Sequence, residues 1–230
     1  MFNICIADIN IGIDNKYQYI ENMCRDYITL NDAEFTVSVT DEEIKREDDG
    51  NGVTADYLEI LAVYRKIAEK IIDYNGFLMH GVVTDVGGSG TAFIAKSGTG
   101  KTTHMSLWHK LLGDKMTVVN GDKPLVRIID GVVYAYGTPW AGKENIHKNM
   151  RTRLDNICII KRAEQNECVP LEKKSVFAGL FTQVYRPESG VNVARTIDLL
   201  NEVINKSSFY EIRCNMDISA AKTAYEKIYN

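Results

Sequence analysis

Thr91-Ala-Phe-Ile-Ala-Lys-Ser-Gly-Thr-Gly-Lys-Thr-Thr103 is the stretch that decides the expected fold of this chain of 230 residues. It begins as a short apolar run, typical of a buried strand. It continues into a turn whose glycines supply backbone angles that other residues adopt at a cost. From Lys101 onward apolar residues recur at helical spacing, and Gly113 is expected to end that helix. The stretch therefore predicts a strand, a glycine turn and a helix in direct succession.

This succession is typical of an anion-binding site. The first N–H groups of a helix have no partner within the helix, and the helix N-terminus carries about half a positive charge. Lys101 adds a charge that can reach outer phosphates, and the Thr102 hydroxyl stands where a Mg²⁺ ligand is needed. Ala95 takes the place of the first glycine of the usual spacing, where a small residue suffices. The predicted nucleotide-binding residues are Ser97, Gly98, Thr99, Gly100, Lys101, Thr102 and Thr103; the alternative is a glycine turn before an ordinary helix.

Composition bounds the class of protein. The chain is 45% hydrophobic and 25% charged, which is ordinary for a globular protein. We expect one compact unit, in which an N-terminal α/β segment (1–75) covers a core (76–230) that contains the glycine turn and the C-terminal helices. The net charge of −4 argues against general nucleic-acid binding. No signal peptide or apolar run long enough to cross a bilayer is evident, and the five scattered cysteines fit reduced thiols. We therefore expect a cytoplasmic protein without membrane contact. Homo-oligomers are compatible with the sequence.

Periodicity predicts the remaining elements. A glycine-rich hairpin at 85–90 makes the strand that enters the glycine turn antiparallel to its predecessor, which is unusual for a phosphate-binding loop. The expected strands are near 4–9, 35–39, 77–79, 82–86, 116–120, 125–129, 132–136, 156–160 and, at an edge, 209–214. The expected helices are 17–28, one from Thr54 to Asn75, 173–184, 190–205 and 217–229, with 41–51 a solvated loop or short helix.

Two stretches resemble a known family. Met79-His80-Gly81-Val82-Val83, followed by a glycine hairpin and by residues 95–103, resembles the core of the HPr kinase/phosphorylase family. The glycine loop is also similar to that of ATP-dependent phosphoenolpyruvate carboxykinase. The resemblance covers 77–130 well and the rest by layout. It implies an α/β fold with a mixed, largely antiparallel sheet, a P-loop and flanking helices, with ATP and Mg²⁺ as cofactors. The implied reaction moves the γ-phosphoryl group to a serine-type hydroxyl on a small protein, a peptide or a small molecule.

The candidate carboxylate is Asp122, at the end of the apolar run from Met116. A kinase needs an acid to hold Mg²⁺ or to accept the proton of the attacking hydroxyl. In both related families this strand ends in two aspartates. In this chain one alignment puts Asp122 at the first of these positions and Lys123 at the second. An alignment shifted by one residue puts Gly121 and Asp122 there instead. In either case a single acid remains. This difference motivates a second hypothesis, a non-catalytic ATP-binding sensor, and Asn120-Gly121 is open to interpretation as a hairpin turn. A carboxykinase-like lyase is disfavoured by the length of the chain.

Histidines and cations complete the candidate set. The resemblance places an equivalent of His80 near the transferred phosphate, and a structural role is the alternative. His104 and His109 follow the glycine loop, and we expect both on the helix surface. An irregular segment after Gly137 is rich in cations and is expected to bind the acceptor or the product's phosphate, or to be a solvated basic loop. Its candidate substrate-binding residues are Lys143, Lys148, Arg151 and Arg153.

Overall fold

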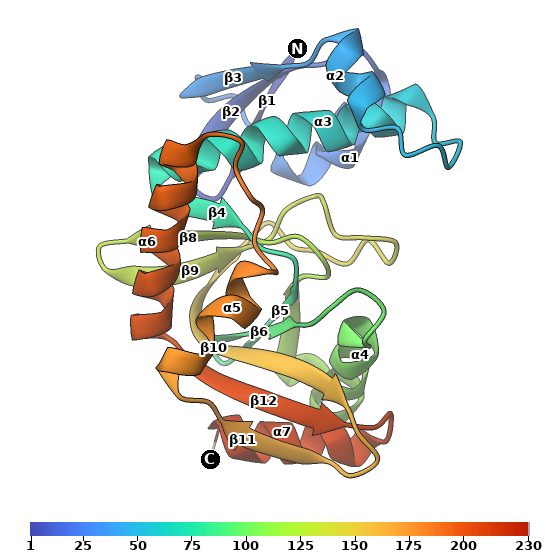
Figure 1. Ribbon diagram of the computed structural model, residues 1–230. Coiled ribbons are helices and arrows are strands. Elements are labelled where there is room, and N and C mark those ends of the chain that lie inside the picture. Colours follow the sequence, from blue (N-terminus) through green and yellow to red (C-terminus); the bar gives the residue numbers. More distant parts are fainter. Residues whose placement is uncertain (230) are drawn as a thin grey trace.

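The chain folds as a mixed α/β protein with two sheets, as a computed structural model that describes residues 1–229 shows (Figure 1). The smaller sheet has three strands and lies at the end of the molecule that holds the N-terminus. The larger has nine. The α/β class expected from the sequence is confirmed. The strands of the smaller sheet are β1 (Phe2–Ile6), β2 (Ile9–Asp14) and β3 (Phe35–Ser38).

The larger sheet is mixed. Its order is β4-β8-β9-β10-β6-β5-β7, with β12 on β10 and β11 on β12. Strand β10 runs parallel to β6 and to β12, and the other pairings described in this sheet are antiparallel, including the predicted β5–β6 hairpin. Its strands are β4 (Gly76–Leu78), β5 (Val82–Val86), β6 (Ser89–Ile94), β7 (Met116–Asn120), β8 (Leu125–Ile129), β9 (Val132–Tyr136), β10 (Arg151–Arg162), β11 (Glu167–Pro170) and β12 (Ser208–Cys214).

Helices cover both faces of the larger sheet. Successive residues of β6 point to opposite faces, so Ala92 and Ile94 join one core cluster while Phe93 joins another. The first cluster includes residues of α5 (Phe177–Phe181) and α6 (Gly190–Lys206). The second includes residues of α4 (Lys101–Leu112) and α7 (Ile218–Tyr229), which pack against each other. Strand β6 is therefore fixed from both sides at the point where it enters the glycine turn.

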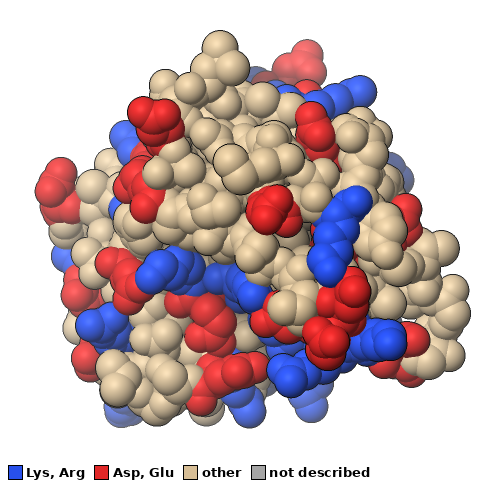
Figure 2. Space-filling model, turned by 90° about the horizontal axis from the view of Figure 1, so that it is seen from above, with Lys and Arg blue, Asp and Glu red and all other residues tan. Residues whose placement is uncertain are grey.

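The N-terminal sheet shares a core with the larger one. One buried cluster holds Ile11 and Val63 together with Tyr136 and Trp140, which follow β8 in the chain. Seen from the N-terminal end, basic and acidic side chains are interspersed rather than gathered by sign (Figure 2), and Arg65 pairs with Glu47 at 2.6 Å. The helices of this part are α1 (Gln18–Met23), η1 (Arg25–Tyr27), α2 (Asp41–Arg46), α3 (Ala55–Lys70) and η2 (Ile71–Tyr74).

Several expected elements differ from the observed ones. The strand expected at 156–160 is longer, because β10 begins at Arg151 and pairs first with β9. Strand β12 is not at an edge, since it lies between β10 and β11, and β11 was not predicted. The helix expected at 173–184 is η4 (Lys173–Ser175) followed by α5. It ends early because Val184 forms a bridge with Met79 and the Tyr185 amide donates to the Leu78 carbonyl.

Within residues 1–229 no helix combines the length and the apolarity that a membrane span requires. The five cysteines are unpaired thiols, four of them buried. Burial raises the pKa of the Cys24 thiol to about 12 and that of Cys168 to about 11, so neither is a reactive thiolate at neutral pH.

Candidate functional site

The glycine loop (residues 95–100) joins β6 to α4. Gly98 and Gly100 have φ angles of +75° and +122°, which side chains rarely adopt. No atom lies within 4 Å of where a Cβ at Gly98 would stand, so the backbone conformation, not crowding, favours glycine there. The Thr99 amide donates to the Lys96 carbonyl at 3.2 Å, and the helix begins when the His104 amide donates to Gly100. The amides that open α4 are therefore available to an anion at the loop.

Lys101 lies under this loop. Its side chain is only 8% exposed, and Nζ donates to the carbonyl of Ala95 at 3.1 Å. Burial lowers the pKa of the ammonium group, and the charge of Asp122 opposes that shift. The bond to Ala95 uses one of several N–H donors of the ammonium group, so others can reach a ligand.

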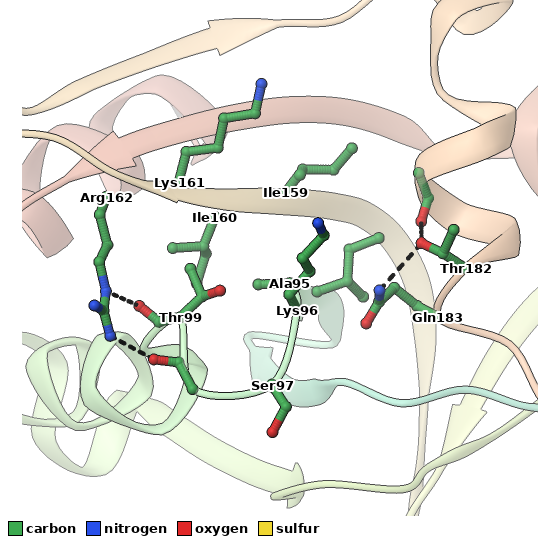
Figure 3. A pocket seen from close by; sticks show the side chains of 13 residues that line it. Ala95, Lys96, Ser97, Thr99, Ile159, Ile160, Lys161, Arg162, Thr182 and Gln183 are labelled. Atoms are coloured by element: carbon green, nitrogen blue, oxygen red, sulfur yellow. Dashed lines mark hydrogen bonds between the residues drawn. The ribbon is translucent and has the colours of Figure 1, made fainter.

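Arg162 at the end of β10 fixes the loop from the other side. Its Nε donates to the carbonyl of Thr99 at 3.1 Å and its Nη2 donates to that of Gly98 (Figure 3). A carbonyl oxygen repels a phosphate, so engaging both with a guanidinium favours the anion-binding orientation of the loop. Sequence reasoning missed Arg162, because its place depends on the parallel register that sets Ile159 opposite Ile94.

Asp122 and His80 meet beside the loop. The His80 Nε2 and Asp122 Oδ1 atoms are 3.3 Å apart, and the Gly81 amide donates to the Asp122 carbonyl. Burial raises the pKa of Asp122, but the hydrogen bond from His80 and the charges of Lys123, His80 and Lys101 outweigh it, so the pKa lies below its usual value. Asp122 is therefore ionised at neutral pH.

Asn120 positions the Asp122 backbone. Its side chain is fully buried, and its Oδ1 accepts hydrogen bonds from the amides of Asp122 and Lys123 at 2.9 and 2.7 Å. Its Nδ2 donates to the carbonyl and hydroxyl of Thr138. The interpretation of Asn120-Gly121 as a hairpin turn is wrong, since β7 pairs with β5 and not with β8. The only sequence signal for this role is an amide side chain at the end of an apolar strand.

Thr102 and Asp122 line one cavity of about 750 Å³. The opposite wall comes from the N-terminal segment, to which sequence reasoning assigned no chemistry. Nothing local marks these residues as site residues, because only the tertiary fold brings them to Asp122. The residues from that segment are Tyr19, Asn22, Met23, Tyr57, Ile60 and Leu61. Within residues 1–229 no group of three or more His, Cys, Asp or Glu side chains is placed to hold a metal, so a metal here would also need oxygens from a ligand.

The four candidate substrate-binding cations do not form one cluster. Lys143 lines the cavity of Asp122, whereas Lys148 is exposed and its amide donates to the Val119 carbonyl. Arg151 and Arg153 are not in an irregular loop, because both belong to β10. Arg151 pairs with Asp8 and lies over the ring of Tyr134, and Arg153 pairs with Asp155. Their charges are thus engaged by side chains outside the cavity.

His104 is buried, contrary to the expected surface placement, while His109 is exposed as expected. The indole Nε1 of Trp108 donates to His104 Nε2 at 3.0 Å, and Cys214 Sγ lies 3.8 Å from Nδ1. Burial lowers the pKa of His104 to about 4. His104 is a neutral core residue that anchors α4 and is not a candidate for proton transfer.

Comparisons with known proteins add little. No protein family and no curated protein matches the sequence. Among solved structures, the HPr(Ser) kinase/phosphatase from Coxiella burnetii is similar over 55% of this chain and 90% of its own, at 8% sequence identity and a TM-score of 0.30. A similarity this low concerns only the arrangement of elements in part of the fold.

Proposed function

We propose that this protein binds ATP with Mg²⁺ at the glycine loop and transfers the γ-phosphoryl group to a hydroxyl acceptor. One observation carries the proposal. The glycine loop opens into α4 over the nearly buried Lys101, and Thr102 at the start of that helix shares a cavity with the ionised Asp122. Amides, one ammonium group, one hydroxyl and one carboxylate are the parts that phosphoryl transfer requires.

The phosphate-binding groups would be the amides of residues 97–103, with Lys101 neutralising the charge that develops on the γ-phosphoryl group. Mg²⁺ prefers oxygen ligands, and the Thr102 hydroxyl and the Asp122 carboxylate offer them on one cavity wall. The ion would neutralise phosphate charge. The hydrogen bond from Lys101 Nζ to the Ala95 carbonyl keeps the ammonium group fixed before ATP arrives, which lowers the cost of ordering it.

Asp122 would also orient or deprotonate the acceptor hydroxyl. An acid with a lowered pKa is a weak base, so its role is to align the hydroxyl and take the proton late in the reaction. His80 donates to the same carboxylate and holds it in one orientation. The single acid would then serve the metal and the acceptor in turn.

The acceptor would enter the cavity between Asp122 and the N-terminal segment. Tyr19 and Tyr57 are 47% and 42% exposed there, and Lys143 adds a positive charge at the same cavity. Lys123 also lines this cavity, and the mixture of rings and two lysines suits a hydroxyl on a small protein or peptide, or on a small molecule, with an apolar group and an anionic group nearby.

Phosphoryl transfer from γ-³²P-labelled ATP with Mg²⁺ to serine-containing acceptors tests the proposal. Transfer is expected from the wild-type protein and is expected to be lost in Lys101→Ala and Asp122→Asn. Tight binding of ATP in a calorimeter without turnover on any acceptor would instead establish a non-catalytic sensor. The motivation for this alternative is that Lys123 stands where the related families have a second aspartate. Absence of ATP binding refutes both.

A further inference from the structure

A second cavity, of about 580 Å³, adjoins the glycine loop (Figure 3). Residues of the loop from Lys96 to Thr99 form one side of it, the end of β10 a second and α5 a third. The side chains of Ile94 and Ile159 give part of its wall an apolar surface. A ligand whose phosphates are bound at the loop therefore has an adjoining apolar space for the group at its other end.

Gln183 is the unusual residue of this cavity. Its side chain is 9% exposed, and its Oε1 is buried without a hydrogen-bond partner among residues 1–229. Its Nε2 donates to the Thr182 hydroxyl at 3.2 Å, and that hydroxyl donates its own proton to the Gly179 carbonyl at 2.8 Å. Because the hydroxyl proton is engaged, Thr182 must accept from Gln183, which fixes the amide orientation. The atom left without a partner is thus a hydrogen-bond acceptor.

We propose that this cavity binds the base of the nucleotide and that Gln183 Oε1 accepts a hydrogen bond from the exocyclic 6-amino group of adenine. The inference rests on the proposed function, in which the glycine loop binds the phosphates. Gln183 lines the cavity, and its terminal torsion is broad, so a small rotation that keeps the bond from Nε2 to the Thr182 hydroxyl turns Oε1 to a ring there. A base without that amino group leaves the buried acceptor unsatisfied, which weakens binding.

A neighbouring cavity gives an internal control. It lies on the other side of Arg162, has a volume of about 440 Å³ and is lined in part by Thr103, Cys214 and Met216. Within residues 1–229 no unpartnered buried side-chain atom belongs to this neighbouring cavity. The two cavities share Gly98, Thr99 and Arg162, so each adjoins the loop, but among the described residues only the cavity of about 580 Å³ is lined by a buried acceptor without a partner.

The test compares the affinities of ATP and of purine riboside triphosphate, which has hydrogen in place of the 6-amino group, by calorimetry with Mg²⁺. The wild-type protein is expected to bind ATP about 10- to 100-fold more tightly. Gln183→Met is expected to bind the two equally. Thr182→Val frees the amide to flip and is expected to reduce the ratio, whereas Thr182→Ser keeps the hydroxyl and the ratio. Met216→Ala is expected to leave it unchanged.

Equal affinities in the wild-type protein overturn the inference and leave the proposed function intact. A ratio that survives in both Gln183→Met and Thr182→Val but falls in Met216→Ala also overturns it, and assigns the base to the neighbouring cavity. Thr182 is exposed, so Thr182→Val remains informative if Gln183→Met does not fold. If neither nucleotide binds, the proposed function itself is refuted. Inorganic triphosphate, a ligand without a base, serves as the check: its failure to bind as well shows that the glycine loop does not bind phosphates.

Discussion

The two loops of the candidate site are fixed in different ways. The glycine loop after β6 takes its shape mainly from its own residues, since Gly98 and Gly100 adopt positive φ angles and α4 follows at once. The loop after β7 takes its shape from distant residues. There Asn120 reaches to Thr138, and the Tyr64 hydroxyl donates to the Lys123 carbonyl at 2.6 Å.

This difference shows where chemistry can be inferred from sequence. A phosphate-binding turn needs particular residues at adjacent positions, so it leaves a local pattern. A positioned carboxylate needs only an aspartate whose surroundings hold it, and those surroundings come from residues far apart in the chain. Substitutions can break each loop separately and so measure how far the two depend on each other.

The largest expected effect is at Lys101. Lys101→Ala removes the ammonium group under the glycine loop, and phosphoryl transfer is expected to fall about 100- to 1,000-fold, or about 3–4 kcal/mol in activation free energy. Lys110→Ala is the matched control, because Lys110 is exposed near the far end of the same helix. Radiolabel transfer measures both. A similar loss in the two variants would show that the charge of α4, not the position of Lys101, matters.

The next effect concerns how α4 is anchored. His104 has its pKa lowered from 6.5 to about 4 by burial, so the unfolded chain takes up a proton at a pH where the native protein does not. His104 therefore leaves the free energy of unfolding unchanged above about pH 6.5 and lowers it by about 3 kcal/mol as the pH drops to about 4. Urea unfolding at several pH values measures this.

His104→Gln is expected to remove that part of the pH dependence, and His109→Gln, at an exposed site on the same helix, is expected to leave it. An unchanged pH profile in His104→Gln would contradict the assignment of His104 as a buried neutral residue.

Asn120→Ala tests the second loop. The change leaves the amides of Asp122 and Lys123 and the carbonyl of Thr138 without their partner, and is expected to lower the free energy of unfolding by about 2 kcal/mol. It is also expected to lower transfer activity more than ATP affinity, since the glycine loop stays intact. Ser97→Ala, at an exposed position in the glycine loop, is expected to change stability by less than about 0.5 kcal/mol. Equal losses of stability would mean that the loops do not differ as described.

Much of the fold around the glycine loop was predictable. The β5–β6 hairpin has a glycine signal, and α4 has a helical stripe that ends at Gly113, so sequence identified both. Strand β12 was placed at an edge because nothing local reveals that β10 extends beyond its pairing with β9 and pairs there with β12, nor that β11 pairs with the other side of β12. Pairing between distant strands depends on tertiary packing, which periodicity does not encode.

The site was predictable in the same uneven way. Lys101, Thr102 and Asp122 were predicted as site residues from motif and order, and the fold brings Thr102 and Asp122 to one cavity. Arg151 and Arg153 were grouped with Lys143 because they are near in sequence, yet strand β10 carries them to Asp8 and Asp155. Arg162 and Gln183 escaped notice because a single arginine or glutamine has no pattern until its neighbours are known.

The smallest expected effect joins the two parts of the protein. The Tyr64 ring stacks on Trp140 at 4.0 Å and its hydroxyl donates to the carbonyl of Lys123, so α3 supports the loop that carries Asp122. Tyr64→Phe keeps the stacking and removes the hydrogen bond, and is expected to cost about 1 kcal/mol of stability. Because the loop would then be less ordered, we expect transfer activity to fall several-fold while ATP affinity is unchanged.

Tyr57→Phe provides the comparison for that last change, because Tyr57 lies on the same helix, is 42% exposed and is expected to affect acceptor binding rather than stability. If Tyr64→Phe weakened ATP binding as strongly as it lowered transfer, the support from α3 would have to extend to the glycine loop. The two loops would then be coupled, and the residues of the glycine loop alone would not determine its conformation. If ATP affinity holds while transfer falls, the N-terminal segment acts on the reaction through Asp122, because the Tyr64 hydroxyl bonds the loop that carries Asp122.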